Sequence, residues 1–163
     1  MRVIVLTAGK GERLYPLTKN TPKALLEIGG GETILESQLA NMRKLDIPEV
    51  VLVVGYKAEQ IEAKVKDIQN PKIHTVFNPF FDISNNLVSA WMARFYMEDA
   101  FVLVNGDDIF HERVLRGLLE HQEDICMVID RKDAYDEEDM KVVTRGNRVL
   151  RVSKTIPLAE ANG

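Results

Sequence analysis

Apolar residues gather in five short runs along the chain, and most of the segments between these runs place apolar residues at helical spacing. Short, continuous apolar runs are typical of buried strands. The five predicted strands are 3–6, 50–54, 73–77, 100–104 and 125–129. The spacing predicts helices over 34–45, 58–66, 86–97 and 111–121. Apolar strands that alternate with amphipathic helices predict an α/β fold, in which helices cover both faces of a mostly parallel sheet.

Two local signals add detail to this pattern. Thr33 stands before the first helix and Glu36 follows three residues later, which is the spacing of a capping box. Near the end of the chain, a turn centred on Gly146 separates the strand-like segments 141–144 and 148–152. We therefore expect a capped first helix and a hairpin close to the C-terminal residue.

The composition is that of one soluble globular domain. The chain has 163 residues and a net charge of −4, and a mildly acidic balance argues against a protein that coats nucleic acid. No run approaches the roughly 20 apolar residues that a membrane helix needs, and the N-terminal run lacks a signal-peptide cleavage pattern. We expect a cytoplasmic protein with no nucleic-acid or membrane partner. The single cysteine, Cys126, lies in a predicted strand and is expected to be buried and unreactive.

The loop after the first strand combines two glycines with two cations. Gly9 and Gly11 let the backbone approach a phosphate, and Lys10 and Arg13 add positive charge. A dinucleotide fingerprint would need a third glycine where Leu14 stands, and a P-loop would need Gly-Lys-Ser/Thr at its end. Two glycines alone also fit an ordinary tight turn. Because parallel strands end at one edge of a sheet, this loop should meet the loop after the fourth strand, where a ligand binds.

The longer string from Leu6 to Leu26 resembles the nucleoside-triphosphate transferase family, whose signature is Ala-Gly-x-Gly-x-Arg-Leu-x-Pro-Leu-Thr followed by Pro-Lys-x-Leu. The fixed positions of that signature are Ala8, Gly9, Gly11, Arg13, Leu14, Pro16, Leu17, Thr18, Pro22, Lys23 and Leu25. One departure is Glu12, where the family usually has Ser or Thr. The resemblance implies a Rossmann-like three-layer sandwich with a mixed, mostly parallel sheet. The residues of this loop that we expect to bind the nucleoside triphosphate are Ala8, Gly9, Lys10, Gly11 and Glu12.

The fourth predicted strand runs into the acidic turn 105–108, where a carboxylate can hold Mg²⁺ against triphosphate oxygens. The resemblance places the magnesium aspartate at Asp107. Asp108 is a second candidate, and a turn or helix cap is its structural alternative. The resemblance also makes Lys23 a phosphate ligand. The implied reaction is in-line attack of an acceptor phosphate on the α-phosphorus with release of pyrophosphate. Arg13, Lys23 and Mg²⁺ then neutralise charge, and no general base is needed.

The loop and helix over 78–91 lack the Gln and the Gly-Leu-Ala that the sugar-nucleotide branch usually carries, and they look more like cytidylyltransferases that act on phosphocholine or inositol phosphate. Asn85 is assigned to the nucleotide, and Asn86 and Ser89 to the acceptor, through amide and hydroxyl hydrogen bonds. Helix capping is an equally good interpretation of each. Trp91 lies at helical spacing with other apolar residues and is expected in the core.

The acidic segment 133–142 is of a kind that usually forms a solvated face. It also resembles this branch, in which a later lysine, here Lys154, approaches the acceptor. The family normally continues beyond Gly163 and supplies a second magnesium aspartate. We therefore expect a single domain, 1–163, that is C-terminally incomplete relative to the family. CTP is the expected donor and a small alcohol phosphate the expected acceptor. The alternatives are a sugar-1-phosphate nucleotidyltransferase that uses UTP, dTTP or GTP, a non-catalytic nucleotide-binding module, and a disfavoured dinucleotide-dependent oxidoreductase. A homo-oligomer is compatible with each of these.

Overall fold

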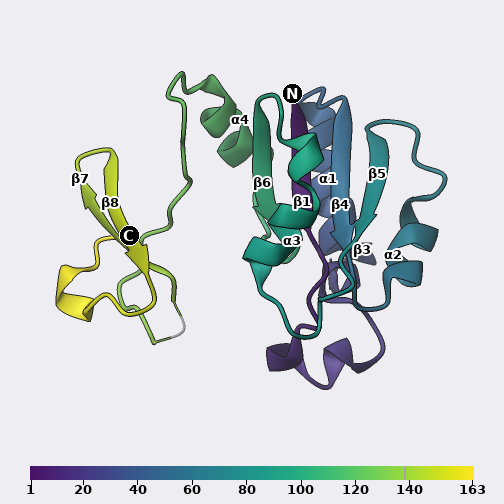
Figure 1. Ribbon diagram of the computed structural model, residues 1–163, viewed down its shortest axis with the longest axis horizontal. Helices are drawn as coiled ribbons and strands as arrows, with labels where there is room; N and C mark the ends of the chain where they lie inside the picture. The colour runs from purple at the N-terminus through teal and green to yellow at the C-terminus, as the bar shows by residue number, and fades with distance from the viewer. Residues whose placement is uncertain (138) are drawn as a thin grey trace. The chain divides into compact units, whose positions relative to one another are not determined.

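The structure of the protein, a computed structural model, describes residues 1–137 and 139–163 (Figure 1). It contains two compact units, Met1–Arg116 and Gly117–Gly163, each held together by its own internal contacts. The boundary between them falls inside helix α4 (Glu112–Glu120). That the chain folds as one domain stays a prediction.

The first unit is built on a four-stranded parallel sheet in the order β5-β4-β1-β6. Its strands are β1 (Arg2–Leu6), β4 (Glu49–Val54), β5 (Lys72–Phe77) and β6 (Phe101–Asn105). The central strands are fully buried over 3–5 and 50–54. The register puts Leu6 beside both Val53 and Asn105, so the loops after β1 and β6 leave the sheet together. The predicted α/β fold and four of the five predicted strands are confirmed.

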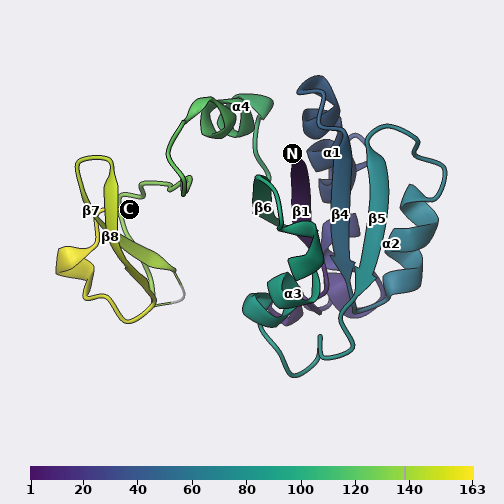
Figure 2. The ribbon, with the colours of Figure 1, turned by 45° about the horizontal axis from the view of Figure 1, so that its top comes forward.

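Helices pack on this sheet from both sides, with α1 behind it and α3 in front of it in Figure 1. Helix α2 lies beside β5 in both views (Figures 1 and 2). The α-helices of this unit before α4 are α1 (Ile34–Lys44), α2 (Ala58–Val65) and α3 (Asn86–Met92). Short 3₁₀ helices occupy Glu12–Leu14, Leu17–Lys19, Lys23–Leu25 and Arg94–Tyr96. The crossover helices bury the central strands and leave the strand ends free to carry loops.

Helix α1 begins with the capping box that the sequence predicts. The Thr33 amide donates to Glu36 Oε2 at 3.0 Å, and the Glu36 amide donates to Thr33 Oγ1 at 3.3 Å. Lys64 also contacts the Glu36 carboxylate at 2.7 Å. Hydrogen bonds from Lys64 first and then from Thr33 lower the pKa of Glu36 to about 2. An antiparallel pair that the sequence did not predict, β2 (Glu27–Gly29) and β3 (Glu32–Thr33), leads directly into this cap.

Helix α3 is shorter than predicted, and it turns a different face toward the sheet. Ala90 and Ala93 pack on the core beneath it, because small side chains allow the helix to approach the sheet closely. Trp91 is 64% exposed, so its predicted place in the core is wrong. Its ring lies instead under the guanidinium of Arg94, whose Cζ is 4.9 Å from the ring centroid. The spacing of large apolar residues indicated a helix, but it did not indicate the buried face.

The second unit contains the predicted hairpin, formed by β7 (Lys141–Arg145) and β8 (Arg148–Ser153), and a 3₁₀ helix at Leu158–Glu160. Gly146 forms the turn with φ of 59°. The predicted strand 125–129 is wrong: it pairs with no described strand, and Ile125 is 92% exposed. A strand needs a neighbour for its backbone groups, and an apolar run does not supply one. Cys126 is accordingly only half-buried, which corrects the expected buried thiol.

Across residues 1–137 and 139–163, no helix has both the length and the apolar character that a membrane crossing requires.

Candidate nucleotide-binding site

The loop after β1 is held at both of its ends. The Thr7 amide and hydroxyl both donate to the Val53 carbonyl, at 2.9 and 2.8 Å. Further along, Thr18 Oγ1 donates to the Gly11 carbonyl at 2.8 Å. Gly11 has φ of 66°, and a Cβ there would lie 3.1 Å from Thr18 Cγ2. Beside Gly9, in contrast, a Cβ would meet nothing within 4 Å. The loop is therefore fixed at Gly11 and leaves open space beside Gly9.

The two cations of this loop lie in different surroundings. The Lys10 ammonium forms an ion pair with Asp82, which belongs to the loop after β5. The hydrogen bond from this pair raises the pKa of Lys10 above its ordinary value. Arg13 is exposed on the 3₁₀ helix Glu12–Leu14, together with Glu12. Asp82 was not singled out from the sequence, since a lone aspartate in a loop carries no signal of its partner.

A cavity of about 200 Å³ opens between the loops that follow β1 and β6. Residues that line it include Gly9, Gly11, Lys23, Asn86, Gly106 and Asp107. Lys23 and Asp107 form an ion pair at this cavity, and their side chains are 33% and 41% exposed. Five residues that the sequence predicted for the site thus come together, although they lie far apart along the chain. The cavity combines a cation, a carboxylate and glycine backbone, which is a suitable lining for a metal-bound phosphate chain.

Gly106 brings the loop after β6 against the end of β1. Its amide donates to the Leu6 carbonyl at 2.9 Å. A Cβ at Gly106 would lie 2.6 Å from that same oxygen and 2.7 Å from Thr7 Cγ2. Only glycine allows this approach without a shift of the backbone at Gly106 or at Leu6 and Thr7. Gly106 therefore sets how close Asp107 comes to the loop after β1.

Asn105 links the acidic turn to its neighbours. Its Oδ1 accepts from Asn86 Nδ2 at 3.1 Å, and its Nδ2 donates to Asp108 Oδ2 at 3.2 Å. Partial loss of solvent around Asp108, followed by the adjacent charge of Asp107, raises the pKa of the Asp108 carboxyl. Asp107 lines the cavity and Asp108 does not, so Asp107 is the better candidate of the two for a metal ligand.

A magnesium ion fits this arrangement as a partner of bound phosphates. Among the described residues, no group of three or more His, Cys, Asp or Glu side chains is placed to enclose a metal. Mg²⁺ commonly takes only one or two carboxylates and completes its shell with phosphates and water. The partly exposed Asp107 carboxylate at the cavity satisfies this requirement, and it is the residue that would hold the ion.

Three predicted site residues form hydrogen bonds with other residues of the first unit. Asn85 caps α3, since its Oδ1 accepts from the Leu87 amide at 3.0 Å. Ser89 is buried, and its Oγ accepts from Asn78 Nδ2 at 3.0 Å. Ala8 is buried, and its carbonyl accepts from the Tyr56 amide at 2.9 Å. Such contacts are what a structural role requires, and binding roles for these residues stay predictions.

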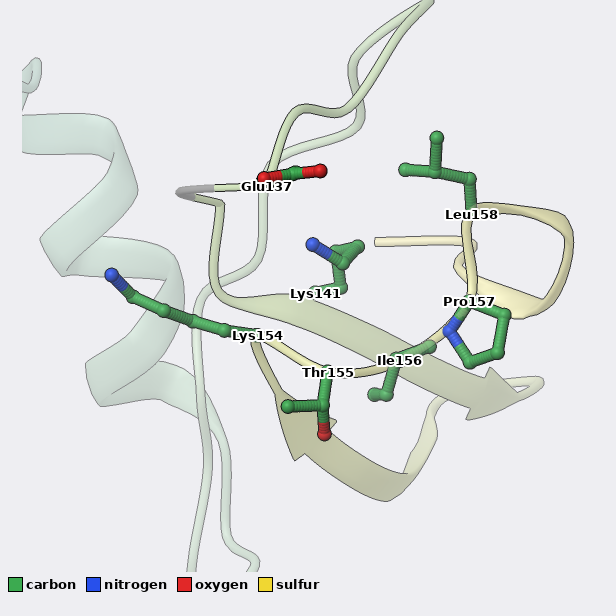
Figure 3. A pocket seen from close by; sticks show the side chains of 7 residues that line it. All are labelled: Glu137, Lys141, Lys154, Thr155, Ile156, Pro157 and Leu158. Atoms are coloured by element: carbon green, nitrogen blue, oxygen red, sulfur yellow. The ribbon is translucent and has the colours of Figure 1, made fainter.

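Lys154 belongs to the second unit, where it lines a separate depression of about 410 Å³ together with Glu137, Lys141 and Thr155. Figure 3 shows the Lys154 side chain extending away from Lys141 and the other labelled residues. Lys141 is buried, and its ammonium donates to the Asp136 carbonyl at 2.9 Å. A contact of Lys154 with an acceptor stays a prediction.

Comparisons with known proteins show which family the chain belongs to. Residues 2–152 match the family model described as nucleotidyl transferase. The CMP-5'-(3-aminopropyl)phosphonate synthase of Streptomyces rubellomurinus is 36% identical over 119 residues, which are 72% of this chain and 19% of that protein. The choline-phosphate cytidylyltransferase of Streptococcus pneumoniae is 27% identical over 159 residues, which are 92% of this chain and 67% of that protein.

The fold has relatives among solved structures as well. The inositol-1-phosphate CTP transferase of T. maritima is 25% identical, with a TM-score of 0.78 over 95% of this chain and 64% of that one. The chain thus spans only part of these relatives, from about a fifth to about two thirds of their lengths. A match over residues 2–152, together with the strand order and the paired loops, shows that the chain belongs to the nucleotidyl transferase family.

Proposed function

We propose that this chain carries the nucleotide-binding machinery of a Mg²⁺-dependent nucleotidyltransferase that uses CTP and a small phosphorylated alcohol. The observation that carries the proposal is the cavity between the loops after β1 and β6, which brings Lys23 and Asp107 together beside Gly9 and Gly11. A cation, a carboxylate and accessible backbone amides are the groups that an Mg²⁺–triphosphate complex needs.

CTP is proposed as the donor because of the relatives. The pneumococcal relative is a choline-phosphate cytidylyltransferase, the Streptomyces relative is a CMP-phosphonate synthase, and the structural neighbour from T. maritima is a CTP transferase. All three names include a cytidine nucleotide and a small organic phosphate or phosphonate. We extend both substrate classes to this chain.

In the proposed reaction, an ionised oxygen of the acceptor phosphate attacks the α-phosphorus of CTP. A new P–O bond forms as the bond between the α-phosphorus and its bridging oxygen breaks, and pyrophosphate leaves with that electron pair. Lys23 neutralises phosphate charge, Arg13 grips phosphate oxygens, and the loop at Gly9 and Gly11 lets the backbone approach the triphosphate. A bound Mg²⁺, held by Asp107, supplies further charge neutralisation. Since the nucleophile is already an anion, the reaction requires no general base.

The test is pyrophosphate release in the presence of Mg²⁺. CTP, UTP, dTTP, GTP and ATP are each paired with phosphocholine, inositol phosphate, aminoethylphosphonate and hexose 1-phosphates. We expect release with CTP and an alcohol phosphate or phosphonate. We also expect a loss of at least about 100-fold in Asp107→Asn and Arg13→Ala, by analogy with the removal of one preorganised charge from an active site. The exposed Asp67, which lies outside the cavity, supplies the control Asp67→Asn.

Each result of this panel leads to a different conclusion. Release with a hexose 1-phosphate and UTP, dTTP or GTP would replace the acceptor and donor but keep the site. Triphosphate binding without release across the whole panel would favour a nucleotide-binding module. Full activity in both site variants would contradict the assigned site, provided that circular dichroism shows them folded.

A further inference from the structure

Gln38 is a buried polar residue on helix α1 that forms hydrogen bonds to the backbone of the acidic turn 105–108. Its side chain is 1% exposed. Its Nε2 donates to the Asn105 carbonyl at 3.0 Å and to the Asp108 carbonyl at 2.7 Å. These two carbonyls stand on either side of Asp107 in the chain. A single amide therefore holds both ends of the turn that carries the proposed metal ligand.

The orientation of the Gln38 amide follows from its partners. Both partners are carbonyl oxygens, which only accept hydrogen bonds, so the NH₂ group must face them. The other end of the amide, Oε1, is then buried, and no described residue donates to it. An unpaired buried oxygen destabilises a fold. An apolar side chain of the same shape would avoid this cost, so packing alone does not account for a glutamine here.

The two hydrogen bonds from Gln38 restrain the backbone on both sides of Asp107. Asp108 also donates its amide to the Asn105 carbonyl at 3.3 Å, which closes the turn, and Gly106 ties it to β1. The bonds from Gln38 restrain the peptide groups at Asn105 and at Asp108. With the turn held at both ends, the Cα–Cβ bond of Asp107 has a fixed direction toward the cavity.

We propose that Gln38 is a positioning residue for Asp107, acting through the backbone of the turn 105–108, and this inference rests on the proposed function of Asp107 as the Mg²⁺ ligand. Gln38 is buried and is not among the residues that line the cavity, so its proposed action on Asp107 is indirect. Partners that orient a ligand from outside the metal shell typically change metal affinity by 10- to 100-fold when they are lost.

The experiment measures Mn²⁺ binding in the presence of saturating CTP by electron paramagnetic resonance. Gln38→Met keeps the length of the side chain, removes both hydrogen bonds and removes the unpaired oxygen. We expect a dissociation constant for Mn²⁺ about tenfold higher than that of the wild type. The midpoint of urea unfolding should fall, because the Asn105 and Asp108 carbonyls lose their Gln38 donor, so the test rests on Mn²⁺ affinity compared with the control below. Gln38→Leu is a smaller second variant, which serves if the methionine disturbs folding.

Asn41 provides the matched control. It lies one turn further along the same helix, is buried, and donates Nδ2 to the Phe110 carbonyl at 2.6 Å. Asn41→Leu removes a comparable hydrogen bond, to a carbonyl that lies beyond the turn 105–108. It should lower stability and leave Mn²⁺ affinity unchanged. Equal losses of affinity in the Asn41 and Gln38 variants would overturn a specific role for Gln38.

A third variant, Asp107→Asn, separates this proposal from the function on which it rests. If Mn²⁺ binding is the same in Asp107→Asn as in the wild type, both proposals fail. If Asp107→Asn weakens binding while Gln38→Met binds like the wild type, the positioning role alone fails. Weaker binding in both, with Asn41→Leu unaffected, supports both proposals.

Discussion

Replacing Gly106 with alanine tests the close approach between the turn 105–108 and the end of β1 at Leu6 and Thr7. The new Cβ would lie 2.6 Å from the Leu6 carbonyl oxygen, 2.7 Å from Thr7 Cγ2 and 3.0 Å from Thr7 Cα. Two of these three atoms are backbone, so rotation of a side chain cannot relieve the contact. Overpacking of this kind costs about 1–3 kcal/mol. Because Asp107 is the next residue, any shift of the turn should also reduce activity and Mn²⁺ affinity.

The assay is urea unfolding, followed by circular dichroism. With a slope of about 2 kcal/mol/M, a cost of about 2 kcal/mol lowers the midpoint by about 1 M. Gly117→Ala is the control, because a Cβ at this position inside α4 would meet nothing within 4 Å. That change should stabilise the protein by about 0.5–1 kcal/mol through helix propensity. An unchanged midpoint for Gly106→Ala would refute the close approach on which the site geometry depends.

Three further changes test other parts of the molecule. The pKa of Glu36 is about 2 in the fold against an ordinary 4.5, so ionised Glu36 stabilises the protein above about pH 4.5, and this contribution is lost as the pH falls toward 2. Glu36→Gln should therefore lose about 1 kcal/mol at pH 7, allowing for solvent screening, and almost nothing at pH 2; equal losses in urea titrations at both pH values would contradict this. Asp82→Asn removes the carboxylate that pairs with Lys10, so CTP binding measured by calorimetry should become about threefold tighter at low salt and gain less at high salt. Unchanged affinity would argue against contact between Lys10 and the triphosphate. Trp91→Ala should change the free energy of unfolding by less than about 0.5 kcal/mol, whereas the buried Leu39→Ala should cost about 2–5 kcal/mol, and similar costs would place Trp91 back in the core.

The sequence predicted the parts of this fold that depend on local patterns. The strands around Val5 and Leu52 are long apolar runs, and the cap at Thr33 has a fixed spacing, so each could be recognised without knowledge of its neighbours. The predicted strand at Ile125 failed because strand formation depends on a pairing partner elsewhere in the chain. Trp91 was misplaced because helical spacing gives a periodicity but does not say which face meets the sheet.

The candidate site could be predicted only as far as motif residues reach. Lys23 belongs to a recognisable signature, Asp107 follows an apolar predicted strand, and the parallel topology indicated that their loops would meet. Gln38 and Asp82 carry no such signal. Gln38 is a single polar residue on an amphipathic helix, and Asp82 is a loop residue 72 positions from Lys10. Their roles depend on tertiary contacts, which become visible only when the elements are packed together.

Under the proposed function, the ion pair between Lys23 and Asp107 would couple the binding of metal to the binding of nucleotide. In the free protein each side chain neutralises the other, so either ligand must compete with a charge that is already in place. A triphosphate drawn to Lys23 releases Asp107 for the metal, and a metal drawn to Asp107 releases Lys23 for the triphosphate. By thermodynamic reciprocity, each ligand should then raise the affinity of the other by the same factor. Two partly exposed side chains would thus make the protein select the assembled metal–nucleotide complex over either component alone.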